Sequence, residues 1–301
     1  MKEILFFSDP HYSVNSEKSE EKWFPPICDF LEKMGWHTAV KRFLKFWDSV
    51  TQSAFRRMIM EATPQGYHYD CVVGLGDYTP GANERGMLTK KAQSQYGTFV
   101  SVLRWVWSAG ELLIWGDHDV GYHFNVGEKA GVKIGTEKGG VSVESVQIAT
   151  DLIGPPFGCF SVGEANFVFI ATNLIRNVDE NSDVKLQKLK LEQENFLAKA
   201  LNDYAGNIFL LLHDPTSLAK ETAVRKIIDS NREKITAIMH GHLHAEFSRF
   251  FAKFSPVYGG LCKEYKTILV PASWGMMGIG GGFLVMNIYD DGTHKIKKYS
   301  T

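Results

Sequence analysis

The chain has 301 residues, of which 44% are hydrophobic and 22% are charged, and these values are ordinary for a globular protein. The formal net charge of −1 gives no global electrostatic reason to expect binding to nucleic acid or to an acidic membrane surface. No apolar run reaches the ~18 residues that a transmembrane helix needs, so we expect no membrane-spanning segment.

Taken in chain order, the apolar runs predict a β-strand over residues 3–8 and an amphipathic helix over residues 38–60. The basic residues of that helix leave two interpretations, a helix that covers a sheet and a helix that lies on a membrane surface. The later predicted elements are a strand over 70–75, a helix over 87–107, a strand over 111–115, an irregular Gly-rich excursion over 120–157, a hairpin within 159–174, a helix over 183–204, a strand over 208–212, a mostly helical stretch over 215–233, a strand over 235–240, and further strands within 246–299, including 267–271 and 283–289.

Five short motifs rich in Asp and His each follow one of the apolar runs that predict strands. Because ligand sites in open α/β sheets form beyond the carboxyl ends of strands, these motifs are expected to meet. Burying so many Asp and His groups together without a metal would be costly, so the series indicates one metal centre. The motifs are Asp9-Pro10-His11, Gly76-Asp77, Gly116-Asp117-His118-Asp119, His213 and Gly241-His242-Leu243-His244.

Each motif alone is weak, because a single Asp-x-His arises by chance and a histidine after an apolar strand is more often a packed core residue. The combination is what indicates a site. Since the motifs extend from residue 9 to residue 244 and one site needs them all, we expect a single domain over 1–301. That domain would carry a helical insertion at about 12–69 and a C-terminal strand region at about 246–299.

The order D-x-H, GD, GNH followed by D or E, H and GHxH resembles the calcineurin-like metallophosphoesterase superfamily. Residues 160–170 resemble its strand pair, and residues 191–197, which contain Gln193, resemble its Gln-containing helix. The resemblance implies an α/β fold, a four-layer α/β/β/α sandwich with two mixed β-sheets. The chain departs from the pattern at Asp117, where the family has Asn. The added negative charge is expected to tighten metal binding and to weaken the attraction of an anionic phosphate.

The resemblance also implies roles for the motif residues. Two divalent metal ions are expected, from among Mn, Fe, Zn and Co, because mixed Asp and His ligands suit these ions. His118 would be the catalyst that is not a metal ligand, and Asp119 is a candidate for orienting it. In an extended segment His242 and His244 would point the same way, and His240, which shares that parity inside the strand, would either support them or be a packed core residue. The implied ligands are Asp9, His11 and His244 for the first ion, Asp117, His213 and His242 for the second, and Asp77 bridging both.

The expected function is hydrolysis of a small-molecule phosphoric ester, a phosphodiester or a phosphomonoester, by attack of a metal-bridging hydroxide. The candidate substrate contacts are Arg85, which follows the GD motif, Arg176, which follows Asn173, and Tyr12 and Tyr78, each just past a motif. One alternative is a pyrophosphatase of a nucleotide-linked lipid precursor, with peripheral membrane contact through the 38–60 helix. Another is a catalytically inert scaffold of the same fold. A nuclease is disfavoured because no basic stripe with interleaved aromatic residues is present.

The four cysteines are widely spaced and form no C-x-x-C pair, so they indicate reduced thiols rather than a disulfide framework. They are Cys28, Cys71, Cys159 and Cys262. No targeting signal is recognisable before the first predicted strand, and we therefore expect a cytoplasmic protein.

Overall fold

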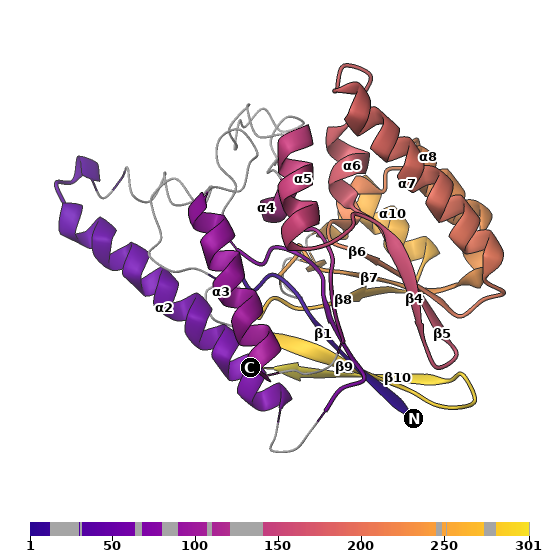
Figure 1. The fold of residues 1–301 in the computed structure, drawn as a ribbon, viewed down its shortest axis with the longest axis horizontal. Coiled ribbons are helices and arrows are strands. Elements are labelled where there is room, and N and C mark those ends of the chain that lie inside the picture. The colour runs from indigo at the N-terminus through magenta and orange to yellow at the C-terminus, as the bar shows by residue number, and fades with distance from the viewer. Residues whose placement is uncertain are drawn as a thin grey trace.

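The structure is a computed structural model that describes residues 1–12, 30, 32–63, 68–79, 90–106, 110–120, 141–244, 249–250, 252–273 and 281–300. It contains two five-stranded mixed sheets (Figure 1). In the first sheet, strands β1, β2 and β3 are parallel, β9 pairs antiparallel with β1, and β10 pairs antiparallel with β9 at the edge. The strand bounds are β1 Lys2–Phe7, β2 Cys71–Gly74, β3 Gly110–Leu113, β9 Gly282–Ile288 and β10 His294–Ser300.

The second sheet has the order β4-β5-β6-β7-β8, with β4 antiparallel to β5 and the other neighbours parallel. Strands β4 and β5 form the hairpin that the sequence predicts, and Gly163 in its turn has a φ of 55°. The strand bounds are β4 Gly158–Val162, β5 Ala165–Phe169, β6 Ile208–Leu212, β7 Ile235–His240 and β8 Thr267–Leu269.

The two sheets pack face to face through buried apolar side chains, because alternate residues of each strand point into the same layer. Phe6 of β1 and Phe167 of β5 meet across this layer with ring centroids 6.1 Å apart. Helices α2 (His37–Ala62) and α3 (Lys90–Val106) cover the outer face of the first sheet. Helices α7 (Val184–Asp203), α8 (Ala223–Ser230) and α10 (Pro256–Glu264) cover the outer face of the second. The predicted four-layer sandwich with two mixed sheets is confirmed.

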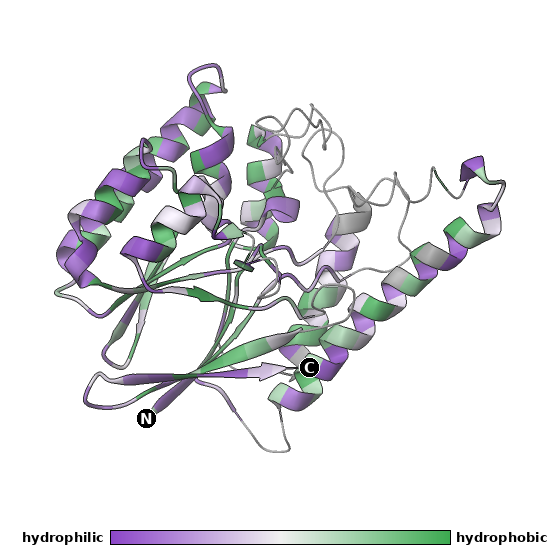
Figure 2. Cartoon of the chain, turned by 180° about the vertical axis from the view of Figure 1, so that it is seen from behind, coloured by the Kyte–Doolittle hydropathy of each residue, from purple (hydrophilic) through white to green (hydrophobic). Residues whose placement is uncertain are grey.

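Helix α2 matches the amphipathic segment predicted over 38–60 and covers a sheet with part of its length. Phe55 and Met58, near its C-terminal end, are fully buried against the first sheet, whereas Phe46 is 64% exposed. Figure 2 shows hydrophobic colouring on strands between the helical layers and mostly hydrophilic colouring on β10. Within the described residues, no helix combines the length and the apolar character needed to cross a membrane.

Helices α5, α6 and α10 lie where no helix was predicted. Residues 141–153, inside the stretch predicted to be irregular, contain α5 (Val143–Leu152), which begins at a capping box between Ser142 and Ser145. The C-terminal region predicted to form strands contains α10, which begins with a Ser255 cap followed by proline. The end of the predicted hairpin is α6 (Thr172–Asn177). In α5 and α10, side-chain caps outweighed the hydrophobic pattern, whereas α6 begins at Ala171 without a side-chain cap.

The topology brings the predicted motifs to one edge of the sandwich. Strands β1, β2 and β3 are adjacent and parallel, as are β6 and β7, so their carboxyl ends lie together in each sheet. The two sheets are joined at this edge by a parallel bridge between Ser8 and Ala272. The backbone N–H of Ser273 also donates to the carbonyl of Ser8 at 3.1 Å.

Candidate metal centre

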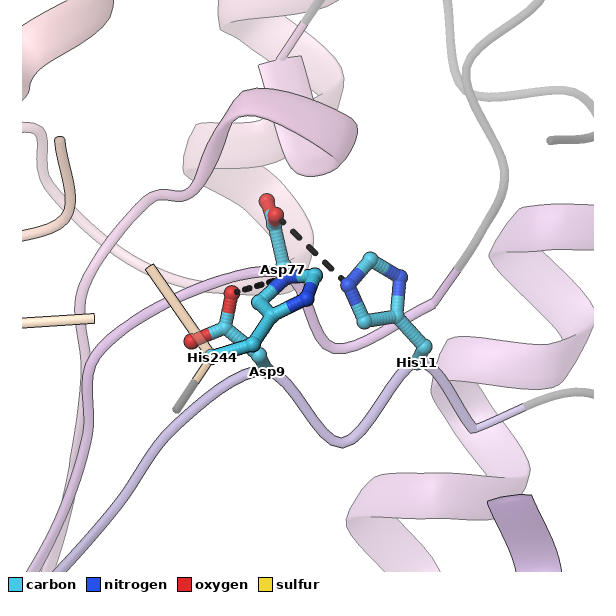
Figure 3. A group of neighbouring side chains, drawn as sticks. All are labelled: Asp9, His11, Asp77 and His244. Atoms are coloured by element: carbon cyan, nitrogen blue, oxygen red, sulfur yellow. Dashed lines mark ion pairs between the residues drawn. The ribbon is translucent and has the colours of Figure 1, made fainter. Parts of the chain in front are cut away.

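A first group of side chains converges from the ends of β1, β2 and β7 (Figure 3). One nitrogen or oxygen atom from each of Asp9, His11, Asp77 and His244 lies within 4.8 Å of those of the others. His244 Nε2 is 3.2 Å from Asp9 Oδ1, and His11 Nε2 is 3.8 Å from Asp77 Oδ2. Two carboxylates and two imidazoles at this spacing form a donor set suited to a divalent transition metal.

A second group shares Asp77 with the first. His213 Nε2 lies 3.1 Å from Asp77 Oδ2, and these two residues form a possible metal-binding set with His242. Asp117, at the start of the short helix α4 (Asp117–Val120), places its Oδ2 3.2 Å from His242 Nδ1. The structure thus brings all seven predicted ligands together, with Asp77 between the two groups.

The hydrogen bonds around the cluster leave selected atoms available to a cation. Asp9 Oδ2 accepts from the Ser8 hydroxyl and from the His242 backbone N–H, which leaves Oδ1 facing the imidazoles. His213 Nδ1 lies 2.6 Å from the Leu75 carbonyl, which can only accept, so its Nε2 points into the cluster. Asp9 Oδ1, Asp117 Oδ2 and His213 Nε2 are buried without a hydrogen-bond partner of acceptable geometry among the described residues. Buried oxygen and nitrogen atoms that lack a hydrogen-bond partner can serve as metal ligands, so these residues fit a metal ion.

Electrostatics within the cluster show strong mutual interaction. Burial opposes ionisation of Asp9, but the His244 and His213 imidazoles outweigh it and lower the pKa of Asp9 to about 2. Burial likewise opposes protonation of His213, yet Asp77 and Asp9 raise its pKa well above the ordinary value. At Asp117 burial prevails, and the pKa of that carboxyl is raised. The cluster therefore attracts positive charge, as protons or as metal ions.

The backbone at these residues is strained. Among the described residues, six other than glycine have a positive φ, and the cluster contributes Asp9, His11, Asp77, His242 and His244, with φ between 41° and 62°. Left-handed backbone costs an ordinary residue roughly 1–2 kcal/mol, and such strain gathers at functional sites. The extended segment predicted for His242 and His244 is wrong, because both lie in a left-handed turn. In consequence His244 faces Asp9 and His242 faces Asp117.

Two motif glycines allow the loops to approach closely. A Cβ on Gly116 would meet the backbone nitrogen and carboxylate of Asp77 at less than van der Waals distance. A Cβ on Gly241 would meet the Ser8 hydroxyl oxygen, and Asp9 Oδ2 at 2.7 Å. Glycine at positions 116 and 241 is therefore needed for these loops to come into contact.

The two predicted catalytic residues, His118 and Asp119, both lie at the cluster but contact different parts of it. The His118 ring is 4.8 Å from the His11 ring, centroid to centroid, and His118 is 8% exposed. The Asp119 carboxylate accepts from the backbone N–H groups of Asp77, Tyr78 and Gly116 at 2.8, 3.1 and 2.9 Å. Burial and the nearby Asp77 raise the pKa of Asp119 to about 7. This carboxylate ties the Asp77 and Asp117 loops together, and the catalytic role predicted for it stays a prediction.

The four predicted substrate contacts do not lie together. The Tyr12 and Tyr78 rings are buried in the apolar layer under α2 and α3, where both contact Phe99, so neither faces the solvent side of the cluster. Arg176 lies next to the second group through an ion pair with Asp214. Arg85 lies outside the described residues.

Sequence reasoning missed Asp214 and Ser8. Asp214 is fully buried, and one of its oxygens lies 3.9 Å from His242 Nε2, so it can be grouped with Asp117 and His242. Its position directly after His213, at the end of a predicted strand, was a signal that could have revealed it. Ser8 carried no comparable signal, because a single serine before Asp9 resembles any other loop residue.

Neither protein-family models nor the curated proteins contain a match to the sequence. Among solved structures, the chain is similar to purple acid phosphatase from yellow lupin (Lupinus luteus) seeds, with a TM-score of 0.49 and 12% identity over 99% of this chain and 51% of that one. It is also similar to Vps29 of Chaetomium thermophilum, with a TM-score of 0.32 and 10% identity over 100% and 97% of the two chains. A protein of unknown function from Aquifex aeolicus matches with a TM-score of 0.32 and 14% identity over 91% and 92%.

The chain spans about half the length of the lupin phosphatase. Likeness at these identities and TM-scores does not assign an activity to this chain.

Proposed function

We propose that this protein is a metal-dependent hydrolase of phosphoric esters. The observation that supports the proposal best is the sharing of one carboxylate, Asp77, by two sets of buried Asp and His donors. A carboxylate between two donor sets is suited to hold two cations at the ~3.5–4 Å separation found in phosphoesterases. The ligand set proposed is Asp9, His11, Asp77, Asp117, His213, His242 and His244.

Two divalent cations in such a site would lower the pKa of water and neutralise the charge of a phosphoryl group. The side chains have separate tasks. Asp9 Oδ2 is fixed by Ser8 and by the backbone of His242, so Oδ1 is presented in one orientation. His213 is fixed as a ligand through Nε2 by the Leu75 carbonyl. His118, beside His11, is positioned to stabilise negative charge or to protonate the leaving oxygen.

A metal-reconstituted hydrolysis panel tests this proposal. The purified chain is loaded with Mn²⁺, Fe²⁺, Co²⁺ or Zn²⁺ and assayed on p-nitrophenyl phosphate, bis-p-nitrophenyl phosphate, a cyclic nucleotide and a UDP-sugar. We expect turnover of at least one ester with at least one metal, and strongly reduced turnover with His118→Ala at unchanged metal content. Turnover of the UDP-sugar alone would favour the pyrophosphatase alternative. Full metal loading without turnover of any substrate would favour the inert scaffold.

A further inference from the structure

Arg176 is held beside the candidate metal centre by a buried carboxylate. Its Nη1 donates to Asp214 Oδ2 at 2.6 Å, while the arginine side chain is 25% exposed. Two of the proposed ligand side chains are partly accessible, with His242 13% and His244 28% exposed. Asp9 and His213 are fully buried. Asp214, the partner of Arg176, has its Oδ1 3.9 Å from Nε2 of the partly accessible His242, which places Arg176 next to an accessible part of the cluster.

The hydrogen bonds of Asp214 assign it to Arg176 rather than to a metal. Its Oδ1, the atom 3.9 Å from His242 Nε2, accepts from the backbone N–H of Thr216 at 2.8 Å and from its hydroxyl at 2.6 Å. A carboxylate oxygen has about two acceptor positions, so this oxygen is fully used. Asp214 Oδ2 binds the guanidinium, so the carboxylate acts as an anchor for Arg176.

Helix α6, which carries Arg176, is fixed on several sides. Gln193 of α7 accepts from the Ala171 backbone N–H at 2.9 Å and donates to the Ala171 carbonyl at 3.2 Å, at the residue that caps α6. Asn173 donates to the Gly116 carbonyl at 3.3 Å, next to Asp117. The Asp214 backbone N–H donates to the Thr172 hydroxyl at 3.3 Å. The guanidinium is thus positioned relative to the Asp117 and His213 loops before any ligand binds.

We propose that Arg176, anchored by Asp214, binds a terminal oxygen of the substrate phosphate and makes the enzyme prefer phosphomonoesters over phosphodiesters. The inference rests on the proposed function, because it concerns the substrate of the same site. A guanidinium presents five N–H donors in a planar fork, and Asp214 engages one edge of it. A phosphomonoester has three terminal oxygens. With two of them facing the cations, the third accepts from Arg176. In a diester that third oxygen is esterified, so it carries no negative charge, is a much weaker acceptor, and its carbon substituent obstructs the guanidinium.

Phosphate binding to the metal-loaded protein tests the inference without relying on turnover. The affinity of inorganic phosphate is measured by calorimetry for the wild type, Arg176→Ala, Arg176→Lys and a matched control, Arg104→Ala. Arg104 also pairs with a carboxylate at 2.6 Å, on α3 away from the cluster. Loss of a charge-assisted hydrogen bond is expected to weaken phosphate binding by roughly 10-fold or more in Arg176→Ala, with no change in the control. Arg176→Lys keeps a cation for Asp214 and loses the fork, so it is expected to bind phosphate at an intermediate affinity.

Two further measurements complete the test. The kcat/KM for p-nitrophenyl phosphate is expected to fall by roughly 10-fold more than that for the bis-ester in Arg176→Ala. Asp214→Asn keeps an acceptor for Thr216 and is expected to retain the full metal content. Loss of one metal equivalent in Asp214→Asn would make Asp214 a ligand and overturn its assignment as an anchor.

The failure of this inference differs from the failure of the proposed function. Wild-type affinity for phosphate in Arg176→Ala and Arg176→Lys, or equal losses on both esters, would overturn the inference while leaving the hydrolase intact. Arg176-dependent phosphate binding in a protein that hydrolyses no ester would overturn the proposed function and support the anion site.

Discussion

His213 Nε2 lies 3.1 Å from Asp77 Oδ2, while the other ring nitrogen of His213 is held at 2.6 Å from the Leu75 carbonyl. Because that carbonyl can only accept, Nδ1 carries a hydrogen, and Nε2 and the carboxylate oxygen face each other with lone pairs. A cation must separate them. A proton on Nε2 can play this part, because Asp77 and Asp9 raise the pKa of His213. A metal ion would replace the proton.

Substitution of Asp77 by Asn is expected to abolish hydrolysis and to lower the bound metal, because this carboxylate faces both donor sets. A neutral amide removes one charge from a fully buried site and leaves the His213 proton without its partner. Metal content by elemental analysis and turnover on the active ester measure the effect. Asp151→Asn, at an exposed residue of α5, serves as the matched control. Full metal content in Asp77→Asn would contradict the proposed bridging role.

Substitution of Asp117 by Asn is expected to leave turnover equal or faster and to weaken metal retention. The pKa of Asp117 is raised by burial and by the neighbouring carboxylates Asp214 and Asp77, although His242 opposes the shift. An amide oxygen still offers a donor atom, and the loss of one negative charge eases the approach of an anionic phosphate. Dialysis against a chelator, followed by residual metal and activity, measures both effects. A variant without activity at full metal content would show that the carboxylate itself is required.

A chain of three hydrogen bonds supports the turn that carries His242 and His244. Arg249 Nε donates to the Tyr258 oxygen at 3.1 Å, Tyr258 donates to His240 Nε2 at 2.9 Å, and His240 Nδ1 donates to the Gly241 carbonyl at 3.0 Å. The direction follows from Arg249, which can only donate. Burial lowers the pKa of His240 to about 4, so the ring is neutral near pH 7 and fits this direction.

Tyr258→Phe is expected to lower the free energy of unfolding by about 1–2 kcal/mol and to weaken metal retention, because His240 Nε2 and Arg249 Nε lose their shared partner. Urea unfolding of the metal-free protein and a chelator competition assay measure the two effects. Tyr265→Phe removes a comparable hydrogen bond, at 2.6 Å to Asp229, and should lose stability without any change in metal retention. Equal metal retention in both variants would mean that the hydrogen bonds from Arg249 to Gly241 stabilise the fold without affecting the metal centre.

The convergence of the motifs was predictable because each motif follows a predicted strand, and the carboxyl ends of parallel strands lie at one edge of a sheet. Residues that follow parallel neighbouring strands meet at one edge whatever their loops do, so Asp9, Asp77 and Asp117 could be grouped from sequence. The sandwich itself was expected from the resemblance that the motifs carry. The conformation of the loops was not predictable, since left-handed backbone at His242 and His244 violates local preference and is imposed by contacts from other loops.

The supporting roles of residues around the site could not be predicted from the sequence for a related reason. Asp214 acts through its hydrogen bond from Arg176, and Gln193 through two hydrogen bonds with the backbone of Ala171, about 20 to 40 residues away in each case, and no periodic pattern records such contacts. The helices α5 and α10 were missed because their caps are short polar signals within stretches that otherwise lack helical periodicity. The substitution of Asn by Asp at position 117 was visible in the sequence, but its proximity to Asp214 was not.

The salt bridges of Arg225 predict a specific dependence of stability on pH. Arg225 is 1% exposed and pairs with Glu264, which also accepts from Lys220 at 2.6 Å. The hydrogen bond from Lys220, and the charge of Arg225, outweigh burial and lower the pKa of Glu264 below its ordinary 4.5. Since the folded-state pKa is lowered, the stabilisation is present above the unfolded pKa. It is lost as the pH falls through the folded value.

Glu264→Gln keeps an acceptor for Arg225 but carries no titrating charge. At pH 7 the variant is expected to be less stable than the wild type by about 1 kcal/mol, a value reduced by the partial exposure of the pair. The difference should shrink as the pH falls below 4.5 and vanish below the folded-state pKa of Glu264, where the wild-type carboxylate is protonated in both states. Urea unfolding of the metal-free proteins at pH 7, 5, 4 and 3 measures the difference, in which the titration of all other groups cancels. Glu192→Gln, at an exposed pair with Lys188 at 3.7 Å, should show almost no difference at any pH. A constant difference between wild type and Glu264→Gln across this range would mean that packing, and not the charge of Glu264, stabilises the contact with Arg225.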